Sequence, residues 1–158
     1  MVLSWKIDPP KIEDPALLAF TKINFTRARF EHMLKKEEEE NDGSIWGEEK
    51  ITRLGAREDL IGADANVGAA LWKNYLWSRG HTILEYLYNV RSVIQFDLPG
   101  TIILDSIGRR HVFVFHRTGG NWDYGFRLLN RNWNVHMPSL VFRKPVGAIR
   151  CWIARCFG

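Results

Sequence analysis

The chain has 158 residues, of which 46% are hydrophobic and 25% are charged, and its formal net charge at pH 7 is +4. This balance is typical of a globular domain and excludes wholesale disorder. The sequence contains no apolar run of the 18 or more residues that a membrane-spanning helix needs. Its first residues lack the basic start and apolar core of a secretory signal. We therefore expect a protein without a transmembrane segment.

The charged residues are distributed unevenly. Residues 1–60 contain ten Lys or Arg and thirteen Asp or Glu, residues 61–100 contain three of each, and residues 101–158 contain nine Lys or Arg and two Asp. The formal charge is therefore −3 in the first segment and +7 in the last. Such asymmetry indicates that the C-terminal third meets something acidic. The acidic surface can belong to a separate partner, to the first third of this chain, or to a neighbouring copy.

Residues 1–13 contain two adjacent prolines and predict an extended N-terminal arm, anchored by Trp5 and Ile7. We expect residues 14–158 to form a single α+β domain, helical over residues 14–94 and rich in basic strands over residues 95–158.

The first predicted helix begins with Asp14 as N-cap and Pro15 at its first position. Apolar residues at helical spacing extend it through Phe30 to Leu34. The acidic run Glu37–Glu40 is unfavourable at a helix C-terminus, so we expect it to fray into a turn.

Two further helices are predicted after residues 44–57, whose pattern is ambiguous. One begins at Glu58, has its apolar stripe from Ile61 onward, and ends at Gly80. The other begins with a capping box formed by Thr82 and Glu85. Its buried stripe is expected to comprise Ile83, Leu87, Val90 and Ile94.

From about residue 95 the pattern changes to that of strands in an antiparallel sheet. Pro99-Gly100 is expected to turn the chain after a short first strand that begins at Phe96. The further expected strands are Ile102–Asp105, His111–Arg117, Tyr124–Leu129, Trp133–His136, Leu140–Arg143 and Ala148–Ala154.

The two cysteines, Cys151 and Cys156, are five residues apart. On one strand their Cα atoms would lie roughly 16 Å apart, whereas a disulfide needs less than about 7 Å. We therefore expect neither a disulfide nor a zinc site, and we place the chain in a reducing, intracellular compartment, namely the cytoplasm, the nucleus or a virion.

The segment Gln95–Ser106 resembles the first motif of haloacid-dehalogenase-type phosphatases, in which one aspartate attacks phosphorus and a second, two residues later, acts as acid and base. Asp97 matches the first position, but Pro99 occupies the second and cannot transfer a proton. No acidic motif that could hold magnesium follows. The sequence therefore nominates no catalytic residue, cofactor or metal, and it favours a non-enzymatic protein.

A second resemblance lies in the C-terminal third. The stretch Thr118-Gly-Gly-Asn-Trp122, followed by Gly125-Phe-Arg127 and Gly147–Cys151, resembles the closing part of C-type-lectin-like domains. This resemblance implies a ligand-binding domain, and it supplies one alternative function.

Arginine and aromatic residues interleave in the C-terminal third, where eight of the nine cations are arginine. Guanidinium groups bind phosphates in bidentate fashion and stack on rings. A sheet with rings between cations suits single-stranded nucleic acid, because the rings stack on bases while the cations follow the backbone. The candidate contacts are Arg109, Arg110, Arg117, Arg127, Arg131, Trp133, Arg143 and Lys144.

The sequence thus predicts a binding protein whose C-terminal sheet engages a polyanion, with nucleic acid (RNA or DNA) favoured. Arg109 and Arg110 are the foremost phosphate contacts, since turns are exposed. The first alternative is a structural subunit of a virion or organellar particle, with the same surface contacting acidic protein in a homo-oligomer or a multi-subunit assembly.

Overall fold

The computed structural model describes residues 6–7, 25, 28–40, 43–78 and 81–144. In chain order the elements are β1 (Lys6–Ile7), β2 (Arg29–Glu31), α2 (Lys36–Glu40), β3 (Ser44–Trp46), α3 (Gly47–Gly55), β4 (Leu60–Gly62), α4 (Ala65–Trp77), α5 (Ile83–Arg91), β5 (Gln95–Leu104), β6 (Arg110–Thr118), β7 (Asn121–Leu128), β8 (Asn132–Asn134) and β9 (Ser139–Arg143).

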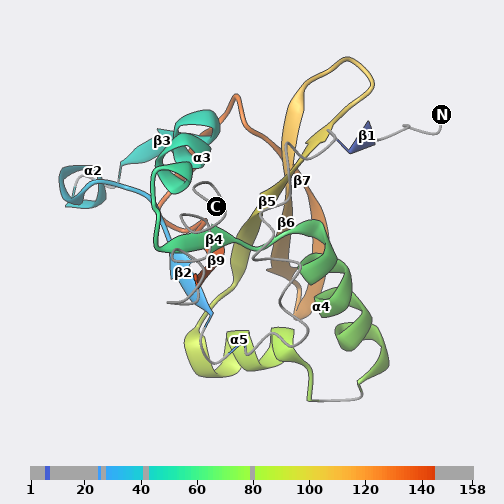
Figure 1. Ribbon diagram of the computed structural model, residues 1–158. Helices are drawn as coiled ribbons and strands as arrows, with labels where there is room; N and C mark the ends of the chain where they lie inside the picture. The colour runs from blue at the N-terminus through green and yellow to red at the C-terminus, as the bar shows by residue number, and fades with distance from the viewer. Residues whose placement is uncertain (1–5, 8–24, 26–27, 41–42, 79–80, 145–158) are drawn as a thin grey trace, which may run out of the picture.

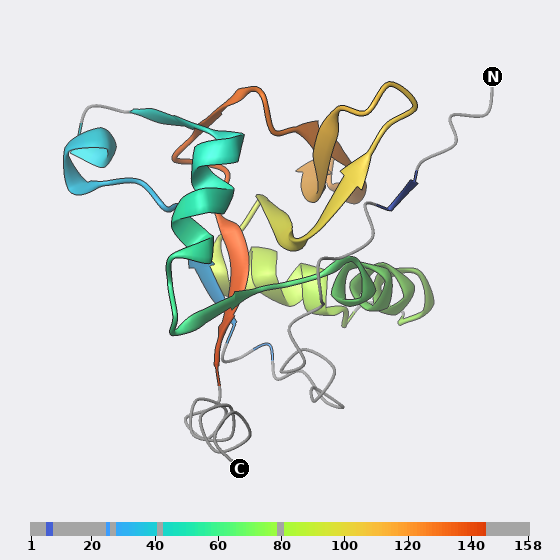
Figure 2. The ribbon, with the colours of Figure 1, turned by 45° about the horizontal axis from the view of Figure 1, so that its top comes forward.

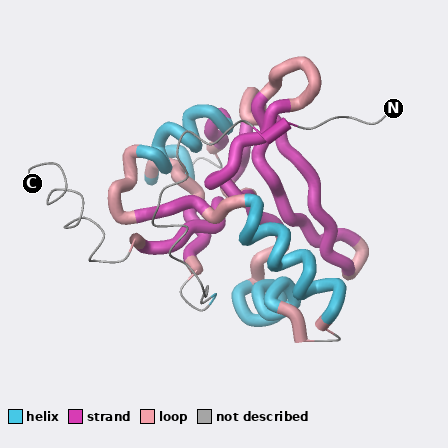
Figure 3. The backbone as a smooth tube through the Cα atoms, turned by 45° about the vertical axis from the view of Figure 1, so that its right-hand side comes forward, coloured by secondary structure: helices cyan, strands magenta, loops and turns pink. Residues whose placement is uncertain are grey.

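The centre of the molecule is a mostly antiparallel sheet with the strand order β2-β9-β5-β6-β7 (Figure 1). The short strands β1 and β4 pair with β5 and β9, and β3 and β8 form a separate two-stranded ribbon. The long strands β5, β6 and β7 form an antiparallel meander, which is visible as the long magenta segments that lie side by side in Figure 3. The mixed α+β class expected from the sequence is confirmed.

The two faces of this meander bury different elements. On one face Phe96 and Phe115 pack with residues of α4 and α5, for example Leu71 and Leu87. The opposite face carries a second cluster, in which Val112 and Val114 pack with the β3–β8 ribbon and α3. Figure 2 shows α4 and α5 together on one side, away from α3. Successive side chains of a strand point to opposite faces, so one strand serves both clusters.

Several strands expected from the C-terminal pattern are confirmed within a residue or two of their ends. They are His111–Arg117, found as β6, and Leu140–Arg143, found as β9. Tyr124–Leu129 is found earlier in the chain, as β7. The expected strand at Ala148–Ala154 and both cysteines lie outside the described residues, as does most of the N-terminal arm.

The prediction of a helix that continues to Leu34 is wrong over its last part, because Arg29–Glu31 form strand β2. The start of that helix at Asp14 lies outside the described residues. In β2, Phe30 pairs with Leu140 of β9, and its ring meets that of Phe96 at 5.4 Å between centroids. These distant contacts decide the local conformation.

The prediction that Glu37–Glu40 frays is also wrong, because this run forms its own short helix, α2. The helix is only five residues long, so the acidic side chains also lie in its first turn, where the dipole favours them. Glu38 accepts hydrogen bonds from Arg53 Nη1 at 2.6 Å and Nη2 at 3.0 Å, so it ties α2 to α3.

The second predicted helix begins later than Glu58. Residues Leu60–Gly62 form β4 against β9, and Asp64 is the N-cap of α4, accepting from the Val67 amide at 2.9 Å. Small residues of this region do permit close packing. A methyl group on Gly68 would lie 2.8 Å from the side chain of Leu98.

The third predicted helix is confirmed as α5, and the Thr82 hydroxyl accepts from the Glu85 amide at 3.1 Å. Its stripe is partly wrong, because Leu84 and Leu87 are the buried residues, whereas Val90 and Ile94 are largely exposed.

The turn expected at Pro99-Gly100 is wrong, since β5 is one continuous strand from Gln95 to Leu104. The pairing with β6 shifts register between Leu98 and Ile102, so the ladder is irregular there, as at a β-bulge. Proline has no amide proton for the ladder and is tolerated at such a bulge.

Candidate functional site

Three of the eight predicted contacts line one groove at the edge strand β7. They are Arg109 from the β5–β6 turn, Arg127 near the end of β7, and Arg131 from the turn after it. The groove has a volume of about 700 Å³, and the indole of Trp46 lies on its wall. None of the described residues that line it is Asp or Glu. We call this feature the arginine groove.

The position of Arg109 is set by a tight turn around Asp105. One carboxylate oxygen of Asp105 accepts from the amides of Ile107 at 3.0 Å and Arg109 at 2.9 Å. The other oxygen accepts from Arg109 Nε at 2.6 Å and lies 3.1 Å from His111 Nε2. Burial opposes ionisation of Asp105, but these hydrogen bonds outweigh it and hold the pKa of the carboxyl well below its usual range. Asp105 therefore stays charged and holds Arg109 at the groove.

Arg127 is held against Trp133. Its Nη2 donates to the Asn132 carbonyl at 3.0 Å, and its guanidinium carbon lies 5.2 Å from the Trp133 ring centroid. Its buried Nε has no hydrogen-bond partner among the described residues. Trp133 itself is buried, so its ring packs beneath Arg127, and the prediction that it contacts nucleic acid stays a prediction.

Arg131 is exposed and makes no ion pair with any described residue. Its backbone is fixed, because its carbonyl accepts from the Gly47 amide at 3.0 Å. Trp46 precedes that glycine and pairs with Asn132 across the β3–β8 ribbon. Its side chain is 56% exposed. The groove thus presents a cation without a carboxylate partner and an open aromatic ring.

Two of the other predicted contacts are held by acidic residues of this chain. Arg110 Nη1 donates to Glu48 at 2.7 Å, which joins the basic third of the chain to its acidic first third. Arg117 lies 3.6 Å from a carboxylate oxygen of Glu85, and its guanidinium stacks 3.8 Å from the centroid of Tyr88. Arg117 therefore contacts α5 on the face opposite that of Arg127, outside the groove.

Arg143 and Lys144 lie at and just after the end of β9. Arg143 is exposed at the end of β9 and pairs in register with Leu60 of β4, and the Lys144 amide donates to the Asp59 carbonyl at 2.9 Å. Neither residue lines the arginine groove.

The interleaving of arginines and rings in the sequence does not produce a mixed surface on β7. Arg127 pairs with Val112, so its side chain lies on the face of the meander that packs against α3 and the β3–β8 ribbon. Trp122 and Tyr124 lie on the other face, where Tyr124 stacks on Phe113 at 5.2 Å. Most of these rings therefore stabilise the core. The exposed indole at the groove, that of Trp46, comes from residues 44–57, whose pattern was ambiguous.

Asp97, the residue that matched the phosphatase motif, is fully buried. It accepts hydrogen bonds from Lys50 Nζ and from Ser139 Oγ, the latter at 2.7 Å. Lys50 also donates to the Met137 carbonyl at 2.7 Å. This arrangement ties α3 to the sheet and offers no nucleophile to a substrate.

The residues that resembled C-type-lectin-like domains are placed only in part. Residues 118–122 comprise the end of β6, the turn at residues 119–120 and the start of β7, whereas Gly147–Cys151 lies outside the described residues. The lectin-like function therefore stays a prediction.

Among the described residues, no three His, Cys, Asp or Glu side chains are arranged to hold a metal ion. No described helix is long and apolar enough to cross a membrane. Comparisons of the chain with protein-family models, with curated proteins and with solved structures found no match. The function is therefore inferred from the residues of this chain.

Proposed function

We propose that the protein binds a polyanion, single-stranded nucleic acid above all, through the arginine groove. The observation that carries this proposal is the convergence of Arg109, Arg127 and Arg131 with the exposed ring of Trp46 on one hollow, which is lined by no carboxylate of the described residues.

The chemistry of these groups fits the two parts of a nucleotide. Guanidinium groups at the turns can donate to phosphate oxygens in pairs, and Arg131 has no carboxylate partner among the described residues. A base can stack on the open face of an indole, an interaction that tolerates any base sequence. The proposal therefore predicts affinity for single strands with little sequence preference.

The test is a fluorescence-anisotropy titration of the full chain with labelled single-stranded RNA and DNA. For three phosphate contacts on a single strand, the slope of log affinity against log salt should be about −2. Affinity should then fall roughly 20-fold between about 50 and 200 mM salt. Arg131→Glu should weaken binding at the lower salt by at least about tenfold, and it should make the slope shallower.

The matched control is Arg143→Glu, which makes the same charge change at another exposed arginine, away from the groove. This variant should lower affinity much less than Arg131→Glu. Equal losses in the two variants, or no binding of either strand at about 50 mM salt, would contradict the proposal.

A separate observation favours the second candidate function, that of an assembly subunit. An apolar hollow of about 310 Å³ lies between α4 and β7, and beside it Leu76 is 59% exposed and Trp77 is 74% exposed. Exposed apolar patches are typical of protein contacts. If this function holds, light scattering coupled to gel filtration should show an oligomer that Trp77→Ser dissociates. A monomer at all concentrations would leave nucleic-acid binding as the proposed function.

A further inference from the structure

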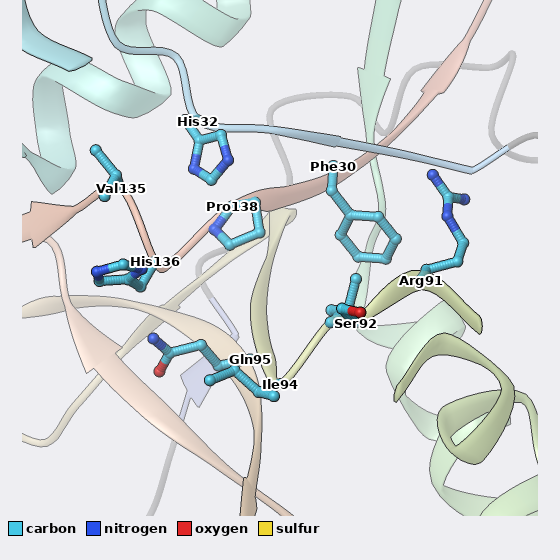
Figure 4. A pocket seen from close by; sticks show the side chains of 10 residues that line it. Phe30, His32, Arg91, Ser92, Ile94, Gln95, Val135, His136 and Pro138 are labelled. Atoms are coloured by element: carbon cyan, nitrogen blue, oxygen red, sulfur yellow. The ribbon is translucent and has the colours of Figure 1, made fainter. Parts of the chain in front are cut away.

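A second cavity lies between β2, the C-terminal end of α5 and the loop that leads into β9 (Figure 4). Its volume is about 540 Å³. Cavities of roughly 300–1,000 Å³ are typical of small-molecule sites. Among the described residues, none lines both this cavity and the arginine groove. We call this feature the histidine cavity, after the two imidazoles on its wall.

Polar side chains reach the histidine cavity from segments far apart in the sequence. His32 follows β2, Gln95 begins β5, and His136 lies in the loop before β9. In Figure 4 these three lie on one side, and Arg91 lies on the other. Each of these side chains can donate a hydrogen bond. None of the described residues that line the cavity is Asp or Glu.

Apolar rings separate the two polar ends. Figure 4 shows Phe30 and Pro138 between His32 and Arg91. The guanidinium of Arg91 is fixed there, because Nη1 donates to the Ala28 carbonyl at 2.8 Å and the guanidinium carbon lies 5.3 Å from the Phe30 ring centroid. Arginine has five N–H donors, so a single bond to a carbonyl leaves donors for a ligand.

Ser92, which caps the C-terminus of α5, adds a hydroxyl to the cavity wall. Its φ is +53°, in the left-handed region that favours glycine. A purely structural cap at this position would be more favourable with glycine. The serine therefore adds a polar group to the cavity at a conformational cost.

We propose that the histidine cavity binds a small organic anion with an apolar body, a carboxylate or a phosphate monoester. The anionic oxygens would accept from the imidazoles and the Gln95 amide, or from Arg91 and Ser92, while the apolar body packs on Phe30 and Pro138. A cavity surrounded by donors without a lining carboxylate favours an anion over a cation. This site is independent of the proposed nucleic-acid function.

The test is an NMR titration of the isotope-labelled full chain with benzoate and phenyl phosphate as anionic probes and benzyl alcohol as the neutral control. We expect saturable shifts of the Gln95 side-chain amide and the His136 resonances. Affinity for at least one anion should exceed that for benzyl alcohol by about tenfold or more. The tighter anion identifies the ligand as a carboxylate or a phosphate ester.

Two variants address the cavity without endangering the fold. His136 is exposed and is anchored through its backbone amide, which donates to Asn134 Oδ1 at 3.1 Å, so His136→Ala should fold. Ser92→Gly relieves the left-handed backbone and removes the hydroxyl. We expect His136→Ala to lower the affinity for the more tightly bound anion about tenfold. Ser92→Gly should lower that affinity severalfold. The control is His81→Ala, at an exposed histidine before α5 that does not line the cavity, which should leave binding unchanged.

Two results would overturn the proposal. One is equal affinity for benzyl alcohol and both anions. The other is a set of shifts confined to Arg109, Arg127 and Arg131, which would place the anions in the arginine groove. Arg131→Glu should leave phenyl phosphate binding unchanged, and His136→Ala should leave oligonucleotide binding unchanged. The two proposals can therefore fail separately.

Discussion

Lys50 on α3 donates a hydrogen bond to the carboxylate of Asp97 on the central strand β5, and both side chains are almost completely buried. Lys50 Nζ also lies 4.7 Å from the centroid of the Trp133 ring. Burial lowers the pKa of Lys50 and raises that of Asp97, while their attraction opposes both shifts. The pair therefore joins the α3 layer to the sheet directly beneath the wall of the arginine groove.

Removal of one partner of this pair should be strongly destabilising. Lys50→Met leaves the Asp97 carboxyl buried without its cation, and we expect a loss of about 3–5 kcal/mol in the free energy of unfolding. The double variant Lys50→Met/Asp97→Leu should lose less than the sum of the two single losses, because no unpaired charge remains buried. Urea denaturation of the four proteins measures this coupling. Additive losses would show that the pair contributes nothing as a pair.

The start of α3 should tolerate no side chain at Gly47. A methyl group there would lie 2.6 Å from the Leu129 carbonyl oxygen and 2.8 Å from the Leu129 Cα, and backbone atoms cannot move aside readily. We expect Gly47→Ala to destabilise the protein by about 1–3 kcal/mol. Gly55→Ala is the matched control in the same helix. A methyl group at Gly55 meets no described atom within 4 Å, so alanine should be neutral or slightly stabilising by thermal denaturation. Equal effects would contradict the close approach.

The bond between Glu38 and Arg53 should make stability depend on pH in the acidic range. Hydrogen bonds from Arg53 and from the Lys35 amide lower the pKa of Glu38 from 4.5 to about 2. A carboxyl whose pKa is lower in the folded state stabilises the protein above its ordinary pKa, and this contribution is lost as pH falls from about 4.5 to about 2.

Glu38→Gln should therefore be less stable than the native protein at pH 7, and the difference should disappear by about pH 2. Chemical denaturation at several pH values measures the difference directly. A difference that is the same at pH 7 and near pH 2 would show that the carboxylate charge is not its source.

Trp46 should report on nucleic-acid binding without affecting stability. A base stacked on its exposed ring should quench the indole fluorescence, and Trp46→Ala should weaken oligonucleotide binding by about tenfold. The control is Trp77→Ala, at a tryptophan that is more exposed and lies outside the groove. Equal affinities of the two variants would remove Trp46 from the interface. Melting temperatures of both variants should stay close to the native value, because neither ring is buried.

Local signals in the sequence predicted elements whose stabilisation is also local. The N-cap at Thr82 was found because the hydroxyl and the amide that it joins are three residues apart. Strand β6 was found because apolar residues fill both of its faces, which is typical of a central strand. The arginines of the groove were likewise recognised, since Arg109 and Arg131 lie at turns.

The rest was decided by residues distant in the sequence. The segments that become β2 and β4 have a helical pattern, but both pair with β9 near the other end of the chain. The spacing of apolar residues within one segment contains no information on its pairing with a distant strand. The energy of that pairing overrides the local helical propensity. The same holds for the run Glu37–Glu40, where Glu38 finds its partner on α3.

By itself, the sequence determined the α+β class, the basic C-terminal third and the residue types that can bind an anion. Only the tertiary structure decided which cations remain open to a ligand. Glu48 holds Arg110 and Glu85 lies beside Arg117, whereas Arg131 meets no carboxylate among the described residues and lies beside Trp46 in the groove. The physical reason is that a charge is available only where the fold brings no opposite charge to it, and the fold brings these groups together from segments that are not adjacent in the sequence.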